Sequence, residues 1–90
     1  MVHKIKLDRQ FCDEVLYGRK QFEIRKDDRG YKVGDTIVFI PWLPTYEQPF
    51  QHPIANTSFE IRYILRGWGL MPGYVAMQLK ETGELLEKEK

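Results

Sequence analysis

The sequence predicts an α+β domain that is mainly β, a small β-barrel with one N-terminal helix at its side. Two observations support this fold class. Five short segments carry the alternating or continuously apolar pattern of β-strands, and one early segment carries a helical pattern. Stretches rich in glycine and proline separate these segments. Because a closed sheet has no exposed edges, a barrel is a suitable arrangement for so small a domain.

The first strand and the helix occupy the start of the chain. Ile5 and Leu7 fall on one face of an alternating segment, which predicts a half-buried strand. Apolar side chains then recur at helical spacing from Asp8 to Tyr17, and Asp8 is placed to accept hydrogen bonds from the free amides of the first turn. Gly18 is expected to end this helix, because glycine readily adopts a positive φ.

Further along, the pattern predicts strands at residues 21–26, 36–40, 59–65 and 74–79. The segment 36–40 is short, apolar and rich in β-branched residues, so we expect it to be buried on both faces. Prolines throughout residues 41–58 predict a long loop, and glycines in residues 66–73 predict a turn. Residues 1–80 are therefore expected to form the domain, and residues 81–90 a charged tail.

The composition argues against several classes of protein. A chain of 90 residues forms one domain, and 42% hydrophobic residues are enough for a small core. Cys12 is the one cysteine, so no internal disulfide is possible and we expect a reducing, cytoplasmic location. This cysteine and two isolated histidines do not form a ligand set, so we expect no metal and no cofactor. The sequence has neither a membrane-spanning apolar run nor a signal-peptide pattern, so we expect no membrane partner.

The charge is unevenly distributed. The net charge of +1 by itself predicts no polyanionic partner. Residues 1–32, however, carry nine Lys or Arg against six Asp or Glu, a local excess of +3. This asymmetry favours a basic face in the first third of the chain.

The residues that follow the helix are the strongest candidates for a functional site. Phe22 and Ile24 fall on one side of an alternating segment, whereas Glu23 and Arg25 fall on the other. Lys20 lies just before them, so three charged side chains are expected near one surface. The alternative, which the spacing leaves open, is a solvated strand face with one ion pair.

These residues resemble a known family. Gly18-x-Lys20-x-x-Glu23-x-Arg25 is similar to the G-x-K-x-x-E-x-R signature of ASCH (activating signal cointegrator homology) domains, members of the PUA-like superfamily. The resemblance covers about residues 1–79 and is strongest to a small bacterial and phage branch of that group, which is named only as a domain of unknown function. It implies a PUA-like barrel of five or six strands, with a cleft between barrel and helix. It also implies RNA or a modified nucleoside as the ligand.

On this basis the chain is expected to bind nucleic acid as a monomer. Its cations would meet phosphates, a carboxylate would accept from a base or hold the cations, and two loop tryptophans would stack on unpaired bases. The predicted binding residues are Lys20, Glu23, Arg25, Lys26, Arg29, Trp42 and Trp68. The alternatives are packing over the barrel ends for the tryptophans and a solvated turn charge for Arg29.

An enzymatic function is the second hypothesis. Some small ASCH proteins resemble amidohydrolases that act on acylated cytidine and use a Lys, a Thr three residues later and a distant Glu. The catalytic candidates are Lys20 at the Lys position, Glu23 at the Thr position and Glu60 as the distant carboxylate. Glu23 would be a general base acting through water, and Lys20 an electrophile. A ribonuclease in which Lys20 and Arg25 stabilise a phosphorane is also possible, but the missing nucleophile favours binding over catalysis.

A third hypothesis is a protein-interaction module that uses the aromatic loop 41–58. A basic face beside that loop would favour RNA, whereas a wholly apolar patch would favour a protein. Cys12, His3 and His52 are expected to have structural rather than chemical roles.

Overall fold

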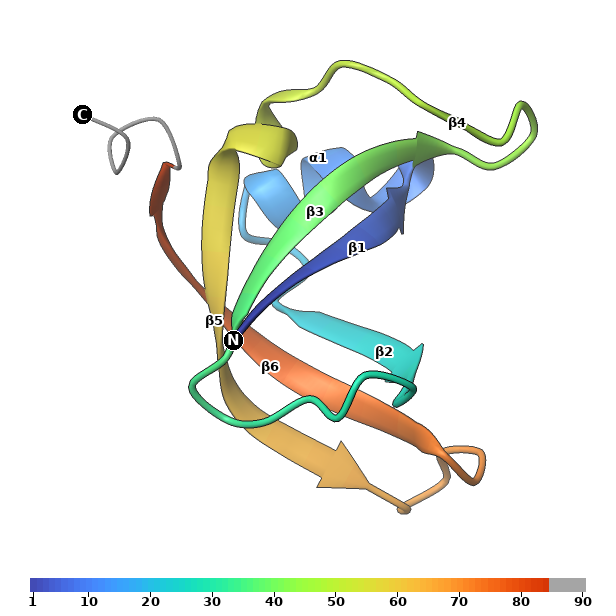
Figure 1. The fold of residues 1–90 in the computed structure, drawn as a ribbon, viewed down its shortest axis with the longest axis vertical. Helices are drawn as coiled ribbons and strands as arrows, with labels where there is room; N and C mark the ends of the chain where they lie inside the picture. Colours follow the sequence, from blue (N-terminus) through green and yellow to red (C-terminus); the bar gives the residue numbers. More distant parts are fainter. Residues whose placement is uncertain (85–90) are drawn as a thin grey trace.

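The computed structural model describes residues 1–84, and these residues form a mainly β fold with one α-helix. The elements in chain order are β1 (Val2–Asp8), α1 (Arg9–Leu16), β2 (Phe22–Lys26), β3 (Thr36–Leu43), β4 (Gln48–Pro49), the 3-10 helix η1 (Pro53–Asn56), β5 (Thr57–Arg66) and β6 (Tyr74–Glu84). Figure 1 shows the sheet curling into a half-barrel with α1 beside it. The predicted fold class, a small β-barrel with one helix at its side, is confirmed.

The order of the strands places two of them at the ends of the sheet. Across the described residues the order is β1-β3-β5-β6-β2, with the short strand β4 paired to β3. The β1–β3 pair is parallel, and the other pairs are antiparallel. Because the sheet is curled, its end strands β1 and β2 lie on the same open side of the half-barrel (Figure 1).

The helix follows the sequence prediction closely. The Asp8 side chain caps α1 by accepting a hydrogen bond from the amide of Gln10 over 3.0 Å. Tyr17 is the C-terminal cap, and Gly18 follows it with a φ of +79°. Cys12 is buried against the sheet, as expected from its place on the apolar face of the helix.

The prediction of a long loop over residues 41–58 is wrong. Strand β3 continues through Pro41 to Leu43 and then turns back into β4, and η1 leads into β5. Pro41 is tolerated because its carbonyl oxygen accepts from the Phe50 amide over 3.1 Å, while its nitrogen faces the same edge of the strand. On that edge the ladder to β5 ends at Val38 and the ladder to β4 begins at Trp42, so Pro41 lies between two ladders and interrupts neither.

The last strand is also longer than predicted. Strand β6 runs to Glu84, past the expected domain boundary at residue 80. Its end is paired with the start of β5, where the hydroxyl oxygens of Ser58 and Thr82 are 2.9 Å apart. The rest of the predicted charged tail, residues 85–90, lies outside the described residues.

The core fills the inside of the curled sheet. It includes the side chains of Ile5, Leu7, Cys12, Val15, Ile37, Phe39, Phe59, Ile61, Val75, Met77 and Leu79. Tyr31, from the segment between β2 and β3, is also buried and packs edge-on against the His3 ring, with 4.7 Å between centroids. His3 Nε2 lies 2.8 Å from Asp35 Oδ2, so this histidine has a structural role, as predicted.

Candidate functional site

Strand β2 presents Glu23 and Arg25 inward, whereas Phe22 and Ile24 face outward. Phe22 and Ile24 are 47% and 50% exposed, whereas the side chain of Glu23 is only 7% exposed. The register explains this arrangement, because Glu23 lies opposite Met77, whose side chain is in the core. The predicted alternation is therefore confirmed, with the face of Glu23 buried, and the alternative of a solvated strand face is wrong for Glu23.

Two cations hold the buried carboxylate of Glu23. Lys20 Nζ lies 2.9 Å from Glu23 Oε1, and Arg25 Nε lies 3.1 Å from Glu23 Oε2. We call these three residues the charged triad. A buried carboxylate loses its hydration, and a cation at each oxygen compensates for that loss. The prediction that Lys20, Glu23 and Arg25 converge is confirmed.

The connection between α1 and β2 positions Lys20. The Lys20 amide donates to the carbonyl oxygen of Glu14 over 2.9 Å, and Lys20 Nζ also donates to the Phe22 carbonyl oxygen over 2.8 Å. The ammonium lies 5.0 Å from the ring centroids of both Phe11 and Phe22, a distance at which cation–π attraction is effective. The lysine therefore has fixed partners on the helix and on the strand.

Two arginines connect the end strands of the sheet. Arg25 Nη2 donates to the Lys6 carbonyl oxygen over 2.6 Å, and Arg29 Nη1 donates to the Lys4 carbonyl oxygen over 2.9 Å. Both carbonyls belong to β1, whereas Arg25 belongs to β2 and Arg29 to the turn that follows it. We call this contact zone of Lys4, Lys6, Arg25 and Arg29 the seam. Its two arginines donate to carbonyl oxygens of the end strand β1, which would otherwise lack a partner on this edge of the sheet within residues 1–84.

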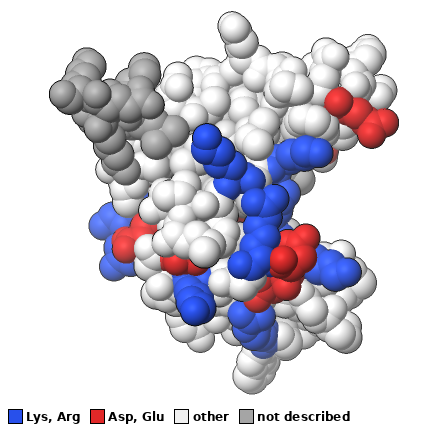
Figure 2. All heavy atoms as spheres, viewed as in Figure 1, with Lys and Arg blue, Asp and Glu red and all other residues white. Residues whose placement is uncertain are grey.

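The seam is also a row of positive charges. The side chains of Lys4 and Lys6 are exposed, and Lys6 Nζ lies 4.0 Å from the ring centroid of Trp42. Figure 2 shows Lys and Arg atoms running along a hollow on the open side of the molecule, with acidic atoms beside them. Lys26, at the end of β2, is exposed as well. The basic face expected from residues 1–32 therefore includes side chains from both end strands.

Two predicted site residues lie apart from the seam. Trp68 is on the turn between β5 and β6, 89% exposed and with a φ of +55°. In Figure 1 this turn is at the opposite end of the molecule from the β3–β4 hairpin that carries Trp42. Glu60 lies opposite Lys80 in the register and is 3.7 Å from Arg62. Since its neighbours in β5 face the core, Glu60 points to the other side of the sheet from Glu23.

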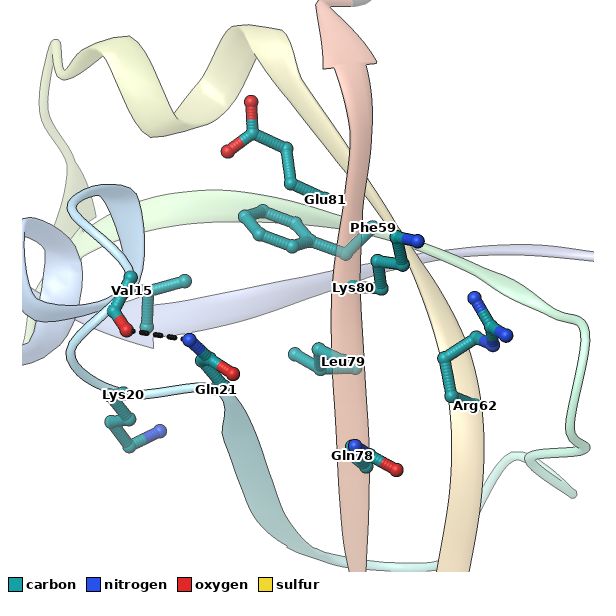
Figure 3. Close-up of a pocket in the computed structure, with 10 residues that line it drawn as sticks. Val15, Lys20, Gln21, Phe59, Arg62, Gln78, Leu79, Lys80 and Glu81 are labelled. Carbon is teal, nitrogen blue, oxygen red and sulfur yellow. Dashed lines mark hydrogen bonds between the residues drawn. The ribbon is translucent and has the colours of Figure 1, made fainter.

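A cavity of about 690 Å³ lies between the α1–β2 connection and the upper parts of β5 and β6 (Figure 3). Its lining consists of Val15, Gly18, Lys20, Gln21, Phe59, Arg62, Gln78, Leu79, Lys80 and Glu81. The lining combines three apolar side chains, Val15, Phe59 and Leu79, with three cations and one carboxylate. The volume is within the usual range for small-molecule pockets.

Sequence reasoning identified Lys20 in this cavity and missed its other polar lining. Arg62 is the unpaired residue of a β-bulge, where the β5–β6 register shifts between Ile61 and Tyr63. A bulge turns a side chain away from its regular direction, and a single sequence does not specify where it occurs. The remaining lining residues depend on how β6 is placed against the helix connection, which has no local sequence signal.

Other chemistry has little support in the described residues. Residues 1–84 contain no group of three or more His, Cys, Asp or Glu side chains that could hold a metal ion. Burial, with the nearby carboxylates of Asp13 and Asp8, raises the pKa of the Cys12 thiol to about 11, which disfavours the nucleophilic thiolate. None of the helices in this part of the chain is long and apolar enough to cross a membrane.

The chain matches one family over most of its length. Residues 2–79 match the domain of unknown function DUF3850. The chain is also 43% identical, over 42 residues, to a protein of Escherichia phage P2 described as an uncharacterized 12.9 kDa protein in the GpA 3′ region. That segment spans 47% of this chain and 38% of the phage protein. Because the family match extends from β1 into β6, the chain belongs to the DUF3850 family of domains of unknown function.

Proposed function

We propose that this protein binds RNA and that the seam holds the RNA backbone. The observation that carries the proposal is the row of cations along the seam, where Lys4 and Lys6 project beside Arg25 and Arg29. Phosphate contacts supply most of the affinity of proteins for nucleic acid. Lysines meet phosphates as point charges, and a guanidinium has five donors, so each seam arginine keeps donors beyond those used within the protein.

Trp42 and the cavity offer places for bases next to this backbone track. Trp42 is half-buried, and Lys6 lies over its ring. The exposed part of the ring is therefore next to a cation that would contact a phosphate in this proposal. Stacking of a base on an aromatic ring contributes about 1–3 kcal/mol. The cavity beside Lys20 has room for one nucleotide, with apolar side chains that could contact a base and cations that could contact a phosphate. The resemblance to ASCH domains of the PUA-like superfamily supports the same class of ligand and is part of this proposal.

The two alternatives have weaker support. For an amidohydrolase or a ribonuclease, Lys20 and Glu23 are already paired with each other, and Glu60 points to the other side of the sheet. For a protein-interaction module in residues 41–58, Phe50 packs against the core and Trp42 is half-buried, which leaves Tyr46 as the exposed ring. The positions of these residues therefore support an enzyme or a protein-interaction module less well than the cations of the seam support RNA binding.

A direct titration tests the proposal. The affinities of a labelled single-stranded RNA and of an RNA hairpin would be measured by fluorescence anisotropy at about 50 mM and about 200 mM salt. We expect binding at the lower salt and a loss of at least tenfold at the higher salt. Lys6→Gln should weaken binding, whereas Arg19→Gln, which removes an exposed charge paired with Glu14 on the helix side, should not. Absence of salt-dependent binding to both RNAs would reject the proposal.

A further inference from the structure

The sheet has an exposed apolar surface on the side away from the core. Across strands β2, β6 and β5, Phe22, Gln78 and Tyr63 form one row, and Ile24, Ala76 and Leu65 form the next. Directly paired residues share a face of the sheet, so all six side chains lie on the same side. We call them the outer face. Phe22, Ile24 and Tyr63 are each about half exposed, so residues 1–84 leave a large part of each side chain uncovered.

This exposure is unusual for strands that have one face in the core. The solvent side of an antiparallel sheet normally carries polar residues, and a cluster of large exposed apolar side chains marks an interaction surface. In β2 the usual arrangement is reversed: the carboxylate of Glu23 is buried, and the apolar side chains on either side of it, Phe22 and Ile24, are exposed. Lys20 and Arg25 stabilise the carboxylate inside, which allows β2 to keep Phe22 and Ile24 on the surface.

We propose that the outer face binds unpaired RNA bases, with Phe22 and Tyr63 as stacking platforms and Gln78 as the hydrogen-bonding group between them. This inference rests on the proposed RNA-binding function and assigns a second surface to it. Phe22 and Tyr63 both pair with Gln78, so they are two strand spacings apart, roughly 9–10 Å. An amide both donates and accepts hydrogen bonds, which suits the edge of an unpaired base.

The charges around the outer face favour RNA over a protein partner. Lys26 lies two residues after Ile24 in β2, and Lys80 lies two residues after Gln78 in β6. Because side chains alternate between the faces of a strand, these lysines are at the two ends of the outer face. Lys20 Nζ is 5.0 Å from the Phe22 ring centroid, and Arg62 is exposed at the bulge next to Tyr63. The six residues of the face include no carboxylate, and Glu60, which lies on this side of the sheet, is next to two of these cations, opposite Lys80 and 3.7 Å from Arg62. Aromatic side chains surrounded by cations complement stacked bases joined by phosphates.

The position of the face also connects it to the proposed backbone track. Strand β2 is an end strand whose Arg25 forms the seam and whose Phe22 belongs to the outer face. An RNA strand bound along the seam therefore reaches the outer face by passing around β2, close to Lys20. Gln78 lines the cavity as well, so the cavity and the outer face are continuous.

Single substitutions of exposed aromatic residues test this inference. The affinity of an unstructured single-stranded RNA would be measured for wild type, Phe22→Ala, Tyr63→Ala and Tyr63→Phe. Urea unfolding of each variant would confirm that it folds, and Val33→Ala is the matched control at another exposed apolar position. We expect Phe22→Ala and Tyr63→Ala each to weaken binding by about 5- to 100-fold with an unchanged salt dependence. Tyr63→Phe and Val33→Ala should bind like wild type.

The outcomes separate this inference from the proposed function. If wild type binds RNA in a manner that depends on Lys6 but not on Phe22 or Tyr63, the outer face is not a base-binding surface and the seam proposal stands. If wild type does not bind RNA at all, both proposals are rejected. If sedimentation shows a dimer that Tyr63→Ala converts to a monomer, a second copy of the chain covers the face and the inference is overturned. Tighter binding of the matching DNA strand would overturn the assignment to RNA.

Discussion

Arg25 donates a hydrogen bond from Nη2 to the backbone carbonyl oxygen of Lys6 over 2.6 Å, and this bond joins strands β2 and β1. The two strands are at opposite ends of the sheet across residues 1–84, so no backbone ladder in this part of the chain connects them. The same guanidinium holds Glu23 through Nε. Arg25 therefore contributes to the contact between the end strands, to the burial of the carboxylate and to the positive charge of the seam.

Replacement of Arg25 should destabilise the fold. Arg25→Ala removes a charged hydrogen bond across the seam and one of the two cations on Glu23. We expect a loss of about 2–3 kcal/mol in the free energy of unfolding, measured by urea denaturation. The control is Arg62→Ala, which removes an exposed guanidinium 3.7 Å from Glu60 and should cost less than about 1 kcal/mol. Equal effects of the two variants would show that the seam bond does not stabilise the fold.

Neutralising Glu23 should lower the stability of the fold even though glutamine is almost the same size as glutamate. Glu23→Gln leaves Lys20 and Arg25 close together without the carboxylate between them. We expect a loss of about 2–3 kcal/mol of unfolding free energy, less than for a fully buried pair because both cations keep some contact with water. The double variant Lys20→Met/Glu23→Gln should recover part of that loss. A stability of Glu23→Gln equal to that of wild type would contradict this view of the triad.

Stability should decrease in acid because of two carboxylates with lowered pKa values. A hydrogen bond with His3 lowers the pKa of Asp35 below its ordinary 3.8, and the Tyr31 amide together with Arg66 does the same for Asp27. These carboxylates bind protons more readily in the unfolded chain, so their contribution is present above about pH 4 and is lost as the pH falls below it. Urea denaturation between pH 7 and pH 3 should show this decrease. Asp35→Asn should be less stable at pH 7 and show a smaller decrease, and an unchanged pH profile would contradict the assignment.

The Cys12 thiol should be unreactive while the protein is folded. Burial raises its pKa to about 11, so only a small fraction is thiolate at pH 8. Reaction with DTNB, followed by absorbance, should therefore be slow in buffer and fast in urea. Rapid reaction under native conditions would mean that α1 opens readily or that the thiol is accessible.

Local signals predicted some parts of the fold well. Asp8 and Gly18 mark the ends of α1 because a cap and a positive φ depend only on the residues around them. The motif predicted the convergence of Lys20 and Glu23 for a similar reason, since they are three residues apart at a helix–strand junction.

Other parts depend on long-range pairing that one sequence does not specify. Alternation in β2 identified two faces, but the partner Met77 decides which one is buried. Pro41 was expected to end a strand, and it remains inside β3 because it lies between the ladder to β5 and the ladder to β4. Arg62 lines the cavity because of a bulge, and Arg29 bonds to a carbonyl of β1 that is distant in sequence.

The salt dependence of RNA affinity tests the central claim most directly. It would be measured for wild type, Lys4→Gln, Lys6→Gln and the control Arg19→Gln, with one single-stranded RNA over a range of salt concentrations. If the seam holds the RNA backbone, each seam variant should reduce the slope of log K against log salt concentration by about 0.7–1, and the control should retain the wild-type slope. A wild-type slope near zero, or seam variants with the same slope as the control, would contradict the account.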